Sequence, residues 1–134
     1  MSDPVLPPVR TVFRALATTF VPETASLDER GWSALEAVVE DALALRPPKI
    51  RRQLATLIRL LDMLPLLRHG RRFTALAAGA RLAFLAAMQD APVLLLRRGV
   101  WGLRTLVLMG YYAGPEGATA VGYRADPRGW EARR

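Results

Sequence analysis

The 134-residue chain contains no cysteine, no asparagine, and only one lysine and one histidine. Without cysteine, the chain cannot form disulfides, thiolate-bound zinc sites, iron–sulfur clusters or thiol nucleophiles. A single histidine, His69, cannot build a multi-histidine metal site and leaves one candidate for a serine–histidine–aspartate triad. We therefore expect no catalytic, cofactor-binding or metal-binding residues in this chain.

Long apolar runs are also missing. The stretch 82–96 is interrupted by Asp90 and Pro92, and the uncharged stretch 105–115 is shorter than the roughly 18 residues that a transmembrane helix needs. Residues 2–8 show neither the basic segment nor the apolar segment of an export signal. We expect a cytoplasmic protein without a transmembrane segment, periplasmic only if it is exported with a partner. Peripheral membrane contact stays open.

The net charge of +7 is distributed unevenly. Residues 1–45 carry seven acidic side chains against three arginines, whereas residues 46–104 carry twelve basic side chains against only Asp62 and Asp90. Such a basic segment can contact nucleic acid, an anionic membrane or an acidic protein, or can be a solvated face whose arginine stems pack on apolar neighbours. No recognition motif is present and the amides that read bases are scarce, so nucleic-acid binding is not expected.

The chain is rich in alanine, leucine and arginine and lacks alternating β-branched runs, which predicts an all-α fold. Helices are expected at about 8–20, from a capping box at Ser26 and Glu29 to about 43, at 49–67 with a break at Pro65, at 76–88 and at 92–112. A short sixth helix is expected to end near 121. We predict a single compact bundle of five to six helices over residues 1–123, followed by a short polar tail at 124–134.

Two features resemble catalytic groups but have simpler interpretations. Glu36 and Glu40 are one helical turn apart, as an acid–base pair requires, but we expect them on an outer, solvated helix face. His69 precedes Gly70, and we expect it at the capped end of a helix rather than at a reaction centre.

The predicted helix at 92–112 is apolar on two sides. One stripe comprises Val93, Leu96, Val100, Leu103, Val107 and Gly110, and a second comprises Leu94, Trp101 and Leu108. Such a helix lies in the middle of a bundle or beneath a partner. Glycines at 99, 102 and 110 each cost roughly 1 kcal/mol of helix propensity relative to alanine, so we expect a close approach by another backbone there.

The segment 102–116 (GLRTLVLMGYYAGPE), followed by Val121-Gly122-Tyr123, resembles the C-terminal signature of the gluconate dehydrogenase small-subunit family. A similar helical region precedes the catalytic body of long-chain alcohol oxidases. The segments 14–23 and 70–76 resemble the opening helix and central loop of the family, so the likeness spans about residues 9–123. Two features differ: the chain shows no twin-arginine signal, and residues 77–80 (AAGA) replace a Ser-Pro-Glu-Glu helix cap.

The resemblance implies an accessory role. Such small subunits accompany a large FAD-dependent oxidoreductase of the glucose–methanol–choline class, which carries the flavin and the catalytic residues and oxidises an alcohol, sugar or sterol. The chain would then be a non-catalytic subunit that stabilises this partner and helps to shape its substrate entrance. The alternative is a free-standing basic helical module that binds nucleic acid or an anionic membrane.

We place the predicted partner interface on the last long helix and the segment after it. The candidates are Arg97, Trp101, Arg104, Leu108, Tyr111, Tyr112, Tyr123 and Trp130. Tryptophan, tyrosine and arginine are the side chains most enriched at the energetic centres of interfaces. For the three tyrosines, packing in the chain's own core and termination of the helix are the competing interpretation.

Overall fold

The computed structural model describes residues 4–113, and over this range the protein is all-α, without strands. The helices are α1 (Arg10–Phe20), α2 (Glu29–Ala44), α3 (Pro48–Met63), α4 (Leu66–His69), α5 (Ala78–Gln89) and α6 (Leu94–Tyr112), with short 3-10 turns at Pro7–Val9, Pro22–Ser26 and Phe73–Ala75. The predicted all-α fold is confirmed. The short helix near 121 and the tail at 124–134 lie outside the described residues.

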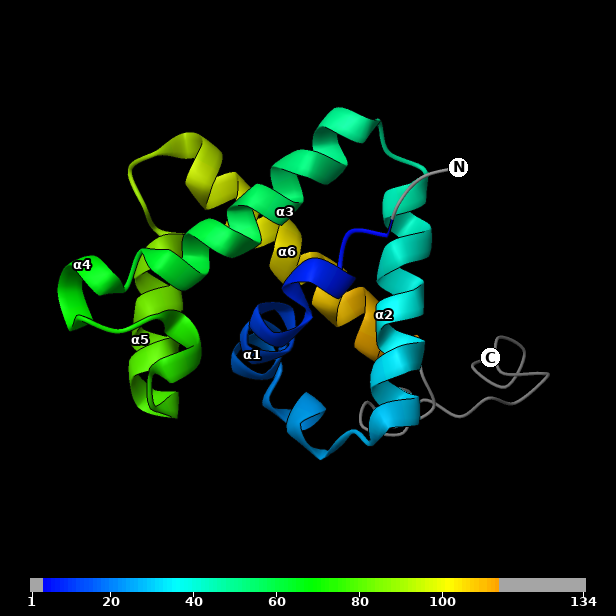
Figure 1. Ribbon diagram of the computed structural model, residues 1–134, viewed down its shortest axis with the longest axis horizontal. Coiled ribbons are helices and arrows are strands. Elements are labelled where there is room, and N and C mark those ends of the chain that lie inside the picture. The colour runs from blue at the N-terminus through cyan, green and yellow to red at the C-terminus, as the bar shows by residue number, and fades with distance from the viewer. Residues whose placement is uncertain (1–3, 114–134) are drawn as a thin grey trace, which may run out of the picture.

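α6 is the central element of the fold. It runs through the middle of the molecule, behind α3, and ends beside α2 (Figure 1). Its most extensive packing is against α2, followed by α5, and α1 and α3 contact it as well. The largest fully buried side chains come from all of these helices and from the segments between them: Leu6, Phe13, Leu16, Leu35, Val39, Ile58, Leu61, Phe73, Leu85, Val100, Leu103 and Val107. One hydrophobic core therefore surrounds the first predicted stripe of α6 from Val100 to Gly110. The prediction is wrong at Val93, which is the N-cap of α6 and 58% exposed, and Leu96 is only partly buried.

Prolines separate the helices where the sequence predicts. Pro65 lies between α3 and α4, because its ring prevents the preceding helix from continuing unchanged. The single turn of α4 ends at Gly70, whose φ of 68° is the only positive value among residues 4–113. His69 is the last residue of this turn, so its expected place at a helix end is confirmed.

The predicted start of the second helix is wrong by two residues. Asp28, not Ser26, is the N-cap of α2, and its carboxylate accepts a 2.8 Å hydrogen bond from the Gly31 amide. Ser26 belongs to the preceding 3-10 turn, where its hydroxyl donates to the carbonyl of Glu23. Both residues are good helix caps, and the 3-10 turn decides between them by engaging the serine.

The expectation that Glu36 and Glu40 are solvated is also wrong. Glu36 is buried, and its two carboxylate oxygens accept from Arg10 Nε at 2.9 Å and from Arg14 Nε at 2.7 Å. Glu40 is partly buried and accepts from the backbone amides of Val5 and Leu6. Both glutamates therefore hold the N-terminal segment and α1 against α2, and their carboxylates are occupied by structural contacts.

Candidate functional site

The outward face of α6 is the candidate functional site. The helix buries one stripe against the bundle, which includes Val100, Leu103 and Val107. Side chains at intervals of three and four residues form the opposite stripe: Leu94, Arg98, Trp101, Thr105, Met109 and Tyr112 are all exposed. We call these six residues the outer stripe. Of the second predicted apolar stripe, Leu94 and Trp101 face solvent, whereas Leu108 is half-buried against the core. The exposed side also carries Arg98 and Thr105, so it is apolar only in part.

Trp101 is held in place at the centre of the outer stripe. Its indole Nε1 donates a 3.0 Å hydrogen bond to the carbonyl of Gln89, at the end of α5. The guanidinium of Arg104 lies over the indole ring, 5.4 Å from the ring centroid. With its polar N–H satisfied within the chain, Trp101 still leaves 44% of its surface exposed, and that surface is largely apolar.

The two tyrosines at the end of α6 have different environments. Tyr111 is buried and belongs to the hydrophobic core, whereas Tyr112 is 39% exposed. Their rings meet edge to face, with centroids 5.1 Å apart. The position of Tyr111 therefore fits the interpretation as core packing, and Tyr112 ends the outer stripe.

The other predicted interface residues are distributed around this face. Leu108 is half-buried against the core, beside the exposed Met109. Arg97 is also half-buried and points back to the turn before α6, where its Nη1 lies 3.5 Å from the carbonyl of Ala91. Tyr123 and Trp130 lie outside the described residues. The structure thus brings together Trp101, Arg104 and Tyr112 on one side of the helix.

Sequence reasoning missed two contributors to the exposed apolar surface. Met109 was not among the predicted interface residues, although its spacing from Trp101 and Tyr112 would have placed it on the same side. Leu67 of α4 is 87% exposed, and no sequence signal distinguishes it from the buried leucines around it, because its exposure depends on where Pro65 redirects the chain.

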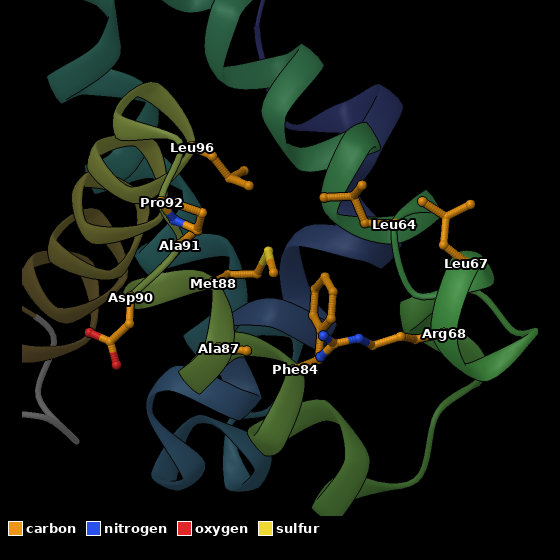
Figure 2. Close-up of a pocket in the computed structure, with 10 residues that line it drawn as sticks. All are labelled: Leu64, Leu67, Arg68, Phe84, Ala87, Met88, Asp90, Ala91, Pro92 and Leu96. Carbon is orange, nitrogen blue, oxygen red and sulfur yellow. The ribbon is translucent and has the colours of Figure 1, made fainter.

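A second apolar feature lies near the start of α6. A groove of about 330 Å³ opens between the end of α3, α4, α5 and the segment that leads into α6. Its lining is mostly apolar, with Leu64, Leu67, Phe84, Ala87, Met88, Ala91, Pro92 and Leu96, and includes Arg68 and Asp90. Figure 2 shows Arg68 extending from α4 toward the groove, while the carboxylate of Asp90 points away from it.

Within residues 4–113 there is no group of three or more histidine or acidic side chains that could hold a metal ion. In the same part of the chain, no helix combines the length and apolar character that a membrane span requires. No protein-family model matches the chain, and no curated protein or solved structure matches it significantly.

Proposed function

We propose that this chain is a non-catalytic accessory subunit that binds a large FAD-dependent oxidoreductase subunit of the glucose–methanol–choline class. The outer stripe of α6 is the observation that carries this proposal, because its second half, Thr105, Met109 and Tyr112, lies within residues 102–116, whose sequence resembles the small-subunit family. One side of residues 102–112 builds the core, and the other exposes Met109 and Tyr112. A partner that covers the outer stripe would bury Leu94, Trp101, Met109 and Tyr112.

Trp101 is suited to anchor such an interface. Its ring is held by the hydrogen bond to Gln89 and by the guanidinium of Arg104 over it. Docking would therefore cost little conformational entropy of this side chain. Interface energy concentrates in a few buried aromatic and arginine side chains near the centre of the contact. Trp101 lies midway along the outer stripe, with Leu94 and Tyr112 at its two ends.

In this proposal FAD and the residues that oxidise the alcohol belong to the partner. The part played by this chain is to cover an apolar face of the large subunit and to stabilise its folded, flavin-loaded form. Binding to the folded partner alone stabilises it by mass action, to a degree set by the concentration and affinity of the small subunit.

The proposal is tested by purifying the tagged full chain from its native cells and recording the visible spectrum of the eluate. We expect a stoichiometric partner that absorbs in the flavin bands and that mass spectrometry identifies as a glucose–methanol–choline oxidoreductase. The variant Trp101→Glu combined with Met109→Glu should lose this partner. Leu45→Glu is the matched control, since Leu45 is 88% exposed at the end of α2 and outside the stripe. A colourless, monodisperse chain that elutes alone would refute the proposal.

A further inference from the structure

The basic middle of the chain has almost no internal charge compensation. Of its two acidic residues, Asp62 is buried and accepts from the amide and the hydroxyl of Thr74, both at 3.1 Å. Asp90 is exposed. Within residues 4–113 the ion pairs involve only Arg10 and Arg14, both in α1. The arginines of α3, α4 and α6 therefore present a positive surface, which is complementary to an anionic partner.

Apolar side chains project from the same part of the molecule. In α4, Leu66 is 41% and Leu67 is 87% exposed. At the entrance to α6, Val93 is 58% and Leu95 is 83% exposed. We call each of these two pairs, Leu66 with Leu67 and Val93 with Leu95, an apolar tip. Leu67 lines the groove from α4, and Pro92 and Leu96, which flank Val93 and Leu95 in the sequence, line it from the start of α6 (Figure 2). α4 and the start of α6 therefore lie on the same side of the molecule (Figure 1).

Arginines follow each apolar tip within five residues in the sequence. Arg68, Arg71 and Arg72 follow the tip in α4, and all three are exposed. At the α6 entrance, Arg98 follows the tip and is exposed, and it belongs to the outer stripe as well, whereas Arg97 is half-buried and turned toward the Ala91 carbonyl. Each apolar tip is thus followed by arginines one to five residues later in the sequence. A long arginine side chain can reach back toward a charged layer while the aliphatic tip lies deeper.

We propose that this side of the molecule docks on an anionic phospholipid bilayer, with the two apolar tips in the acyl boundary and the arginines on the lipid phosphates. Exposed leucines gain little from nucleic acid, whose outer surface is a phosphate backbone. An acidic protein would also satisfy the arginines, but Leu67 stays 87% exposed at the edge of the groove, and Leu95, 83% exposed, is not among the residues that line it. The groove therefore gives neither side chain a pocket that a folded partner would fill. An interfacial membrane anchor uses apolar and basic side chains together.

The first test measures the partitioning of the full chain, alone or in complex with its proposed partner, onto sucrose-loaded vesicles. Vesicles of phosphatidylcholine are compared with vesicles in which roughly one-third of the lipid is phosphatidylglycerol. We expect binding at least about tenfold stronger to the anionic vesicles in about 0.1 M salt, and a marked loss of it in about 0.5 M salt. Equal partitioning onto both vesicles, or none onto either, would refute the proposal.

Paired variants test the location. Leu67→Glu combined with Leu95→Glu, and separately Arg71→Gln combined with Arg72→Gln, should each weaken binding to anionic vesicles by about tenfold or more. The matched controls are Leu45→Glu for the apolar change and Lys49→Gln with Arg52→Gln for the charge change. All of the changed side chains are exposed, so folding is expected to persist. Controls that weaken binding as strongly as the tip variants would place the contact elsewhere.

The absence of cysteine permits a direct measurement of insertion. An environment-sensitive dye attached at Leu67→Cys or Leu95→Cys should shift to the blue on anionic vesicles, whereas the same dye at Leu45→Cys should not. The result is independent of the proposed function, because the outer-stripe variants Trp101→Glu and Met109→Glu should leave the dye shift unchanged. A dye at Leu67 that stays in water while the chain is bound would refute insertion of this tip.

Discussion

Gly110 of α6 packs directly against the backbone of Leu35 in α2. A Cβ at position 110 would lie 3.0 Å from the Leu35 carbonyl oxygen and 3.1 Å from its Cγ. This is the close backbone approach that the glycine-rich sequence of α6 predicts, and it explains how the two helices with the most extensive packing in the fold come together. The same prediction is wrong at the other two glycines of α6, because a Cβ at Gly99 would meet the flexible side chain of Leu57 at 2.8 Å and a Cβ at Gly102 would have nothing within 4 Å.

Gly110→Ala should therefore destabilise the protein by about 1–2 kcal/mol. The methyl group meets a helix backbone that cannot move alone, and overpacking of this kind outweighs the gain in helix propensity. Gly102→Ala is the matched control in the same helix, because a Cβ there has nothing within 4 Å. It should stabilise the protein by roughly 0.5–1 kcal/mol. Urea unfolding of both variants measures the difference, and a stabilising Gly110→Ala would contradict the packing argument.

The buried carboxylate of Glu36 joins α1 to α2, and its neutralisation should be costly. Glu36→Gln keeps the side-chain volume but removes the charge that faces Arg10 and Arg14. We expect a loss of about 1–3 kcal/mol in the free energy of unfolding. Asp41→Asn on the same helix is the control, and as an exposed change it should stay within about 0.5 kcal/mol of the parent. Equal effects of the two variants would mean that the network contributes little.

The ion pair between Arg14 and the exposed Glu29 predicts that the stability of the fold depends on pH. The hydrogen bonds and charge of Arg14 hold the pKa of Glu29 below its ordinary value of 4.5. A carboxylate with a lowered folded-state pKa stabilises the fold above its unfolded-state pKa, and this contribution is lost as the pH falls through the folded-state pKa. The stability difference between the parent and Glu29→Gln should thus be constant near neutral pH and shrink in acid. Urea midpoints from about pH 3 to about pH 7 test this, and a difference unchanged in acid would contradict it.

Helical periodicity predicted the fold class and the central helix because these depend on local spacing. Val100, Leu103 and Val107 recur on one side of α6 and are all fully buried. Their spacing alone is enough to predict that this side of the helix faces the core. The spacing of Leu94 and Trp101 likewise predicted a second apolar face. Periodicity does not say whether such a face meets another helix or solvent, since this depends on how the remaining helices are arranged.

The errors arose where distant residues decide the outcome. Glu36 lies off the main apolar stripe of α2, so a helical projection places it in solvent, but Arg10 and Arg14 reach it from another helix. Val93 fits the spacing of the buried stripe but is 58% exposed, because it is the N-cap of α6 and precedes the part of the helix that packs against the bundle. Both kinds of error concern tertiary placement, which no single segment of the sequence encodes.

The start of α5 offers a last test, because its cap is missing as the sequence predicts. Ala77 is the N-cap, with extended backbone at φ −68° and ψ 158°, and no side chain there accepts from the first turn. A serine side chain at this position has the reach to accept a hydrogen bond from the amide of Gly79 or Ala80. Ala77→Ser should therefore stabilise the chain by about 0.5–1 kcal/mol.

Ala83→Ser in the exposed middle of α5 is the control and should cost about 0.5 kcal/mol, because serine there has only a lower helix propensity. Thermal unfolding of the two serine variants under the same conditions separates the effect of the N-cap hydrogen bond from the lower helix propensity of serine. If both changes lower the midpoint equally, the first turn of α5 gains nothing from a cap, and Ala77 is not the residue that limits the stability of this helix.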